Sequence, residues 1–500
     1  MDLEQARLKL TNLQRRICAF THATALIYWD GETSAPAETA DNRAFSTAVL
    51  NEMIFNLKNG EETVELLEYL NEERDQLSVR ERRTVDFMMR EINNRRLIPV
   101  DEYVAYETLR TKAQDAWHIA TEENDFGLVS PYLEQMFDAQ RSFAKHCRPE
   151  MHPYEYCLDT YEEGLTIQIC DDVFDAIKTE ISPLLQSITD KPQIDDRCLK
   201  GDFPAEKQES LAIYLMELME VDMNRVGLAT SEHPFSTFLG SHFDSRISTK
   251  YSRKDFTPSM YHVLHGIGHV LHDMGQEDNL AYTVLDGSAS MALLESQGRF
   301  YENIIGRSRA FIEYIYPELV ELFPDPVARF TPEDIYRAVN KVEPGPIRIE
   351  SDELTSNLHN LVRYEIEKAL IEGDLRAKDI PDAWAEKYKA YLNLDITDAV
   401  TGALQDIHWF FGAIGYFPNY VVGAAMGAQI VEKMNEDIDL EGCIKEANYP
   451  LINLWNRQNI WKHGGLYNSQ YILEKFVGTA FDSTPYINYL KNKYNDIYRW

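Results

Sequence analysis

The chain begins with long stretches in which apolar residues return every three or four positions. This spacing gathers apolar side chains on one face of a helix. It continues to about residue 225 and is clear in EETVELLEYLNEERDQL and DEYVAYETLRTKAQDAWHIATEEN. It returns in FPAEKQESLAIYLMELME, where Pro204 suits a first helical turn. The pattern predicts a helical lobe over residues 1–225, and this lobe contains no chemical motif.

The pattern changes between residues 233 and 251. In HPFSTFLGSHFDSRISTKY, apolar and hydroxyl-bearing residues alternate loosely and Gly240 interrupts them, which predicts two short strands joined by a turn. Helical spacing then resumes, with Thr257 as an N-cap, Pro258 in the first turn and a stop near Gly275. Further helices are predicted at 289–306, 350–371, 380–393 and 447–462. The fold class is therefore mainly α, with one small sheet near residues 233–251.

The domain organisation follows from what the chain lacks. No Gly/Ser-rich or Pro-rich tract divides the 500 residues, and 44% of them are hydrophobic, which is enough to bury a large core. We therefore expect a single domain over residues 1–500. Within it, residues 1–225 form the helical lobe and residues 226–500 hold the chemistry.

Charge and cysteine content limit the partners and the compartment. The 82 Asp and Glu residues outnumber the 49 Lys and Arg residues and give a formal charge of −33, which repels nucleic acid and anionic membrane surfaces. The first twenty residues are charged and helix-periodic without a signal core, and no long uncharged run follows. The six cysteines show no ligand spacing, which is typical of reduced thiols. We expect a cytoplasmic protein that binds neither nucleic acid nor membranes.

Two histidines mark the first candidate for chemistry. His265 and His269 are four residues apart, so both imidazoles project from one helical face within reach of a single metal ion. A structural or surface role is the ordinary alternative, because His262 and His272 extend the same stripe. The spacing alone leaves both interpretations open.

A third ligand could be Glu295, which follows His269 by 26 residues in the helix-like segment ALLESQGRF. A glutamate on a helix is usually a solvated charge. Two histidines and one carboxylate, however, leave a fourth coordination position for water, as in hydrolytic zinc sites. The three residues predict a site for one divalent metal.

The residue after the first histidine decides the chemistry. In hydrolytic sites of this kind it is a glutamate, which takes a proton from the attacking water and delivers it to the leaving amine. Here it is Gly266, which has no titratable group. Gly266 and Gly268 should each weaken the helix by about 1 kcal/mol relative to alanine. Helix stability therefore does not explain the glycine at the position of the general base.

With their surroundings, these residues resemble the carboxypeptidase Taq family of metallocarboxypeptidases. The resemblance rests on six ordered motifs over about 190 residues: HPF at His233–Phe235, DSRIS at Asp244–Ser248 (DxRxT), HGIGH at His265–His269 (HExxH), ESQGR from Glu295 (HESQSR), IRIESD at Ile347–Asp352 (IRxxAD) and GALQDIHW at Gly402–Trp409 (GxxQDxHW). GYFPNY follows at Gly415–Tyr420.

The resemblance implies a large helical, grooved, single-domain fold related to neurolysin and angiotensin-converting enzyme, with the sheet near the active site. It implies a cytoplasmic homodimer that uses Zn²⁺ or Co²⁺ to remove residues from peptide C-termini. The substrate carboxylate would bind an arginine, because the guanidinium can donate two parallel hydrogen bonds. For the carboxylate, the resemblance implies Arg348 first and Arg246 second. It implies His233 and Asp352 as further substrate contacts. His408 with Tyr420, or Tyr416 in its place, would donate to the tetrahedral intermediate.

Three departures from the family pattern remain: Gly266 for glutamate, Leu294 for the histidine before the ligand glutamate, and Gly298 for serine. The three metal ligands are present, so a bound metal with little turnover is expected, unless Asp273 or Asp244 relays the proton. Two functions stay open, a carboxypeptidase of reduced activity and an inactive relative that binds metal and peptides as a regulator or scaffold. A purely structural helical protein would leave the ordered motifs unexplained.

Overall fold

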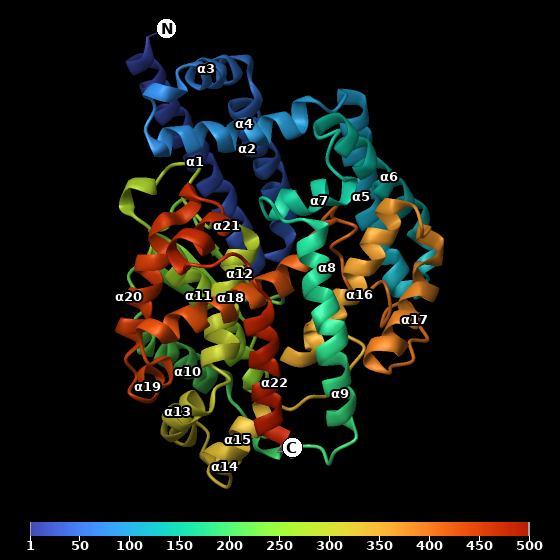
Figure 1. The fold of residues 1–500 in the computed structure, drawn as a ribbon, viewed down its shortest axis with the longest axis vertical. Helices are drawn as coiled ribbons and strands as arrows, with labels where there is room; N and C mark the ends of the chain where they lie inside the picture. The colour runs from blue at the N-terminus through green and yellow to red at the C-terminus, as the bar shows by residue number, and fades with distance from the viewer. Residues whose placement is uncertain (1, 499–500) are drawn as a thin grey trace. The chain divides into compact units, whose positions relative to one another are not determined.

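The computed structural model describes residues 2–498, and most of them are helical (Figure 1). They form two compact units, each assembled from separate stretches of the chain. The first unit comprises the chain up to Asn93, Asp195–Val339 and Ile430–Ala480. The second comprises Asn94–Ile194, Asn340–Gln429 and the chain from Phe481. The single domain over residues 1–500 stays a prediction.

The first unit combines helices with the only sheet of the described chain. Its helices are α1 (Leu3–Thr33), α2 (Ala40–Asn59), α3 (Glu61–Glu72), α4 (Val79–Arg96), α10 (Ala205–Leu218), α11 (Thr257–Met274), α12 (Met291–Arg299), α13 (Arg309–Leu322), α14 (Pro324–Val327), α15 (Pro332–Val339), α19 (Leu440–Lys445), α20 (Tyr449–Asn459) and α21 (Ser469–Ile472). Helix α4 runs three residues past the boundary at Asn93.

The second unit has helices and no strand among its described residues. Its helices are α5 (Val100–Glu123), α6 (Ser130–Cys147), α7 (Pro153–Tyr161), α8 (Ile167–Ala176), α9 (Ser182–Thr189), α16 (Glu353–Glu372), α17 (Ile380–Leu392) and α22 (Thr484–Tyr498). Helix α18 (Pro418–Asp437) contributes residues to both units. In the described part of the chain, every helix is too short or too polar to cross a bilayer.

The sheet has three strands in the order β1-β3-β2: β1 (Val226–Thr230), β2 (Ser236–Phe238) and β3 (Ser245–Thr249). β1 runs parallel to β3, and β2 runs antiparallel to it. The expected small sheet is confirmed, but β1 lies before the predicted range and adds a third strand. Its sequence VGLAT places Gly227 and Ala229, two weak strand formers, between Val226 and Thr230, so its strand signal is weak.

Helix α11 carries the two histidines and begins one residue earlier than predicted. Phe256 occupies the N-cap position, and Thr257 is the first helical residue. The Thr257 N–H and hydroxyl donate to Asp255 Oδ1 at 2.9 and 2.7 Å. The predicted stop at Gly275 is confirmed as the C-cap. Helix α10 is shifted in the opposite direction, because Pro204 lies at its N-cap and not in its first turn.

The remaining predicted helices are confirmed within a few residues at their ends, as α12 with the π-helix η7 (Phe300–Ile305), α16, α17 and α20. Helix α11 is the packing centre of the first unit. Its apolar face, which includes Val263, Leu264 and Ile267, is fully buried. It makes contact with β3 and with α12.

Gly268 lets α11 and α12 meet backbone to backbone. A Cβ atom at this position would overlap the carbonyl oxygen of Gln297 and lie 2.7 Å from its carbonyl carbon. The Gln297 side chain is itself fixed, because its Oε1 accepts a hydrogen bond from Trp461 Nε1 at 2.8 Å. Neither backbone can move away without disturbing buried contacts.

We therefore expect Gly268→Ala to lower the free energy of unfolding by about 1 to 3 kcal/mol, the usual cost of overpacking, although alanine is the better helix former. Denaturant unfolding measures the change. Gly345→Ala is the matched control, since a Cβ at Gly345 meets no atom within 4 Å. A Gly268→Ala protein as stable as the parent would show that the two backbones are not in contact.

Candidate metal centre

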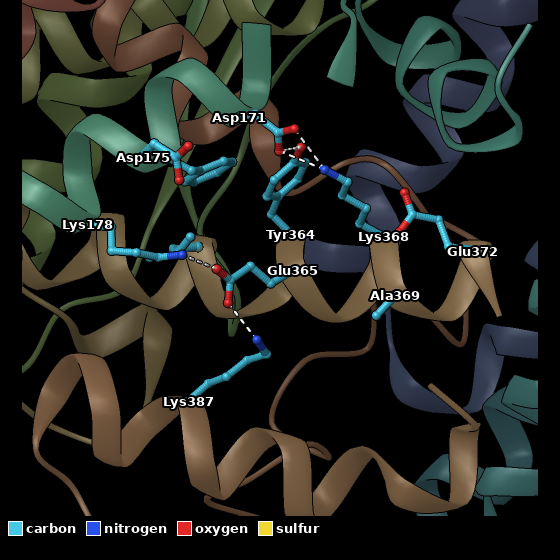
Figure 2. A pocket seen from close by; sticks show the side chains of 11 residues that line it. Asp171, Asp175, Lys178, Tyr364, Glu365, Lys368, Ala369, Glu372 and Lys387 are labelled. Atoms are coloured by element: carbon cyan, nitrogen blue, oxygen red, sulfur yellow. Dashed lines mark hydrogen bonds and ion pairs between the residues drawn. The ribbon is translucent and has the colours of Figure 1, made fainter. Parts of the chain in front are cut away.

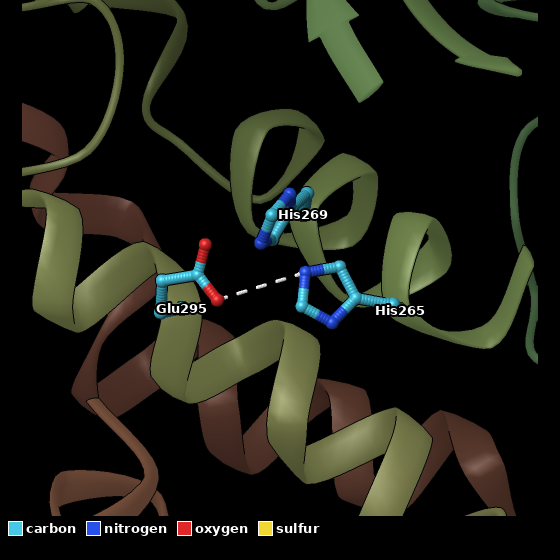
Figure 3. A group of neighbouring side chains, drawn as sticks. All are labelled: His265, His269 and Glu295. Atoms are coloured by element: carbon cyan, nitrogen blue, oxygen red, sulfur yellow. Dashed lines mark ion pairs between the residues drawn. The ribbon is translucent and has the colours of Figure 1, made fainter. Parts of the chain in front are cut away.

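Three side chains from α11 and α12 converge in the first unit. His265 and His269 lie one turn apart on α11, with ring centroids 4.5 Å apart. Glu295 comes from α12, and its carboxylate points toward both rings (Figure 3). One ligand atom from each of the three residues lies within 4.8 Å of the other two, and His265 Nε2 is 3.8 Å from Glu295 Oε2. The structure thus brings the predicted ligands together.

The opposite edge of each imidazole is held by a second polar group. His269 Nδ1 shares a hydrogen bond of 2.8 Å with Ser236 Oγ on β2, and His265 Nδ1 lies 3.0 Å from Glu302 Oε2 on η7. These bonds occupy Nδ1 in both rings, so Nε2 is the nitrogen left to bind a metal. The sequence analysis missed Ser236 and Glu302. Their signals are slight: Ser236 directly follows His-Pro-Phe, and Glu302 lies two helical turns after Glu295.

Glu302 is well suited to hold His265. Burial of its carboxyl group opposes ionisation, but Arg299, His265 and Arg307 outweigh burial and hold the pKa of Glu302 well below its ordinary value. Arg299 Nη1 lies 3.0 Å from Glu302 Oε2, and Arg307 Nη2 lies 3.9 Å from Oε1. The carboxylate is therefore charged and oriented when it accepts the His265 N–H.

The donor set fits a divalent cation. His269 Nε2 and Glu295 Oε2 are shielded from solvent and have no hydrogen-bond partner among the described residues. Leaving such atoms unsatisfied costs about 1 to 3 kcal/mol each, and a shared cation would satisfy both. Loss of hydration, with the neighbouring His265 and His272, holds the pKa of His269 well below its ordinary value. The imidazole is therefore neutral, as a metal ligand must be.

Gly266 faces strand β3. A Cβ atom there would lie 2.9 Å from Ile247 Cγ2 and 3.2 Å from Cγ1. Ile247 and Ser236 are register partners on adjacent strands, so their side chains project from the same face of the sheet, toward α11. Helix propensity alone predicts that glutamate at 266 would stabilise the protein, but the structure contradicts this because Ile247 must shift to admit any side chain.

The other predicted site residues of the first unit are engaged with neighbours or exposed. Arg246 on β3 donates from Nε and Nη2 to the two carboxylate oxygens of Asp244 at 2.7 and 3.0 Å. His233 lies exposed just before β2. Asp273 is a buried carboxyl 3.5 Å from His272 Nδ1, and burial raises its pKa. Asp244 and Asp273 are thus tied to partners of their own.

Arg348 belongs to a charged cluster in the second unit. Its Nε and Nη2 donate to Asp406 Oδ1 at 2.9 and 2.7 Å. Asp406 Oδ2 accepts from Nε of Arg363, a fully buried residue, at 2.6 Å. Two guanidinium groups therefore share one carboxylate. They outweigh its burial and hold the pKa of Asp406 well below its ordinary value. The three side chains retain a net charge of +1.

His408 and Tyr420 lie beside this cluster, with His408 Nε2 3.5 Å from the Tyr420 hydroxyl. Burial lowers the pKa of His408 to about 4, so the ring is neutral near pH 7. Tyr416 packs against both rings, with centroids 5.6 Å from His408 and 5.4 Å from Tyr420. Asp352 caps α16 by accepting from the backbone N–H groups of Leu354 and Thr355 at 2.9 Å. The substrate roles of these residues stay predictions.

A separate pocket of about 410 Å³ opens in the second unit between α8, α16 and α17 (Figure 2). Lys178 and Lys387 both lie 2.6 Å from Glu365, and Lys368 lies 2.8 Å from Asp171. Lys178 and Lys387 thus share one carboxylate, and Lys368 pairs with Asp171. The pocket contains none of the predicted site residues and does not compete with the metal centre.

Comparison with known proteins decides the family. The carboxypeptidase Taq (M32) metallopeptidase family matches residues 9–494. The chain belongs to the carboxypeptidase Taq family. Carboxypeptidase 1 of Bacillus subtilis is 34% identical over 502 residues, which cover 100% of both chains. Thermostable carboxypeptidase 1 of Pyrococcus furiosus is 32% identical over 484 residues and 96% of each chain.

Solved structures of the carboxypeptidase Taq family share the fold. The M32 carboxypeptidase from Deinococcus radiodurans superimposes with a TM-score of 0.96 at 30% identity and covers 99% of this chain and 100% of its own. Membership implies a metallopeptidase that uses a divalent metal and acts on peptides.

We expect the protein to bind one divalent cation per chain and to lose it in acid, because protons compete for both imidazoles. His265→Ala, His269→Ala or Glu295→Ala should each abolish binding at neutral pH. Isothermal titration with Zn²⁺ or Co²⁺ measures the affinity. His262→Gln is the matched control, an exposed histidine on the same helix. Equal binding by His262→Gln and His265→Ala would place the metal elsewhere.

Proposed function

We propose that this member of the carboxypeptidase Taq family holds one Zn²⁺ or Co²⁺ through His265, His269 and Glu295 and removes residues from peptide C-termini with reduced turnover. The observation that carries the proposal is the convergence of the three ligand atoms within 4.8 Å next to Gly266, which has no side chain. The donor set matches a hydrolytic zinc site, with two imidazoles, one carboxylate and an open position.

Residues around such a site would have different roles in hydrolysis. A bound divalent ion polarises the scissile carbonyl and the attacking water. Ser236 and Glu302 hold the Nδ1 edge of the two imidazoles, which leaves Nε2 of each ring to ligate a metal. Gly266 cannot accept the proton of the water, and loss of a general base usually lowers turnover by two to four orders of magnitude. Reduced turnover is therefore the expected result of the glycine.

Arg348 is our first candidate for the substrate's terminal carboxylate, and Arg246 is the second. Arg246 forms a neutral pair with Asp244, whereas Arg348 and Arg363 share the single carboxylate of Asp406. The cluster around Arg348 thus keeps the positive charge that a carboxylate needs. His408 and Tyr420 are proposed to donate to the tetrahedral intermediate, and His233 and Asp352 to contact substrate.

The alternative function is an inactive relative that binds metal and peptides as a regulator or scaffold. The position of Ile247 favours it, because this side chain fills the space from which a general base would project. The family resemblance and the acidic, free-thiol composition also lead us to propose a cytoplasmic homodimer. Sedimentation of a monomer at micromolar concentration would contradict the dimer.

Gly266→Glu should raise cleavage of a peptide with a free C-terminus by at least about a hundredfold, the lower end of what a positioned general base contributes. Position 266 lies about 100° around the helix from His265, so a long carboxylate can reach the attacking water. The gain should come with some loss of stability, because Ile247 must shift. Peptidase kinetics and thermal unfolding measure the two effects.

Two further variants distinguish the effect of a carboxylate at position 266 from the effect of side-chain size. Gly266→Ala adds the Cβ that meets Ile247, and Gly266→Gln adds a side chain of glutamate's size without its basicity. Both should lose stability without gaining activity. If Gly266→Glu binds metal, keeps its fold and is no faster than the parent, then Leu294 or Gly298 has altered the site, and the inactive relative becomes the better description.

Arg348→Ala should weaken binding of a peptide with a free C-terminus by roughly tenfold or more, since hydrogen bonds between charged groups contribute about 1.5 to 3 kcal/mol. The same peptide with an amidated C-terminus should bind parent and variant equally. Fluorescence anisotropy of a labelled peptide on metal-loaded protein measures both. Arg246→Ala is the matched control, and loss of discrimination in that variant alone would move the carboxylate site to Arg246.

A further inference from the structure

The ring of His265 lies directly against the backbone of α12 at Gly298. A Cβ atom at position 298 would lie 2.5 Å from His265 Cε1, 2.7 Å from Nε2 and 2.8 Å from Nδ1. All three of its nearest neighbours are atoms of this one ring, and all three distances are shorter than real Cβ contacts. The imidazole therefore occupies the space that any side chain at position 298 would need.

The same ring is fixed at its other edge. Its Nδ1 lies 3.0 Å from Glu302 Oε2, and that carboxylate is held in turn by Arg299 at 3.0 Å. The side chains of His265 and Glu302 are only 23% and 14% exposed, so solvent offers few alternative partners. A ring displaced from Gly298 would have to give up this contact or drag Glu302 away from its arginine.

We propose that Gly298 and Glu302 act together as positioning residues for His265. The bare α-carbon of Gly298 leaves space for the ring, and Glu302 fixes the nitrogen that faces away from the metal. This inference rests on the proposed metal site and adds a cause for the glycine at 298. Serine, which the family motif carries here, does not fit beside His265 as this chain places it.

A double-mutant cycle in metal-free protein tests the contact. With EDTA present, Gly298→Ala should lower the melting temperature of the parent because the new methyl group meets the ring. In a His265→Ala background the same substitution should leave the melting temperature unchanged or raise it, because alanine favours a helix over glycine. An equal effect in both backgrounds would overturn the role of Gly298.

Metal affinity tests the consequence for the site. Competition with a chromophoric chelator for Co²⁺ should show that Gly298→Ala and Glu302→Ala bind about 10- to 100-fold more weakly than the parent, the usual effect of removing a group that orients a ligand. Glu302→Gln should retain more affinity than Glu302→Ala, because its amide oxygen still accepts from the ring N–H. The Co²⁺ absorption bands should shift in Gly298→Ala and stay unchanged in the control Gly345→Ala.

The outcomes separate this inference from the proposed function. If Glu302→Ala and Gly298→Ala bind Co²⁺ as tightly as the parent and with the same spectrum, the positioning role is wrong and the metal site stands. If the parent binds no Co²⁺, the proposed metal site is wrong. A destabilising effect of Gly298→Ala that disappears in the His265→Ala background would still confirm that Gly298 determines the position of the His265 ring.

Discussion

The backbone contact between α11 and α12 at Gly268 sets the dimensions of the metal centre. Gly268 directly precedes His269, and Gln297 follows Glu295 by two residues, so the contact lies within two residues of a ligand on each helix. A glycine inside a helix costs about 1 kcal/mol relative to alanine. Here that cost is accepted because any larger residue would separate the helix that carries the histidines from the one that carries the glutamate.

The neighbouring elements orient the ligands from two sides. Ser236 reaches His269 from the sheet, and Glu302 reaches His265 from the π-helix that follows α12. Ser236 pairs with Ile247 across the strands, so the residue that fixes one ligand and the residue that fills the space beside Gly266 belong to one register. The glycine at position 266 is therefore connected to the packing of the sheet, because a side chain there would meet Ile247.

The sequence predicted the helical fold and the pairing of His265 with His269 because both depend on local spacing. Glu295 lies 26 residues further on, and its place beside them came from the family resemblance. The four-residue step from His265 to His269 needs only a helix to bring two imidazoles together. The features that it missed join residues distant in the chain, such as Ser236 with His269, Ile247 with Gly266 and Gly298 with His265. Helical or strand periodicity contains no information on such pairs, which depend on tertiary packing.

If a peptide carboxylate binds at Arg348, as we propose, then the pairing of Arg348 with Asp406 affects the rate and the entropy of that binding. Binding to a free arginine on a surface would cost up to about 2 kcal/mol of lost rotamer freedom. The Arg348 side chain is only 11% exposed and bonds Asp406 through two of its nitrogens, so most of that freedom is lost on folding. An anion that docks there meets a guanidinium already oriented. The anion can bind on first contact, because the Arg348 side chain need not change its rotamer. Selectivity then depends on the direction from which the anion approaches the guanidinium.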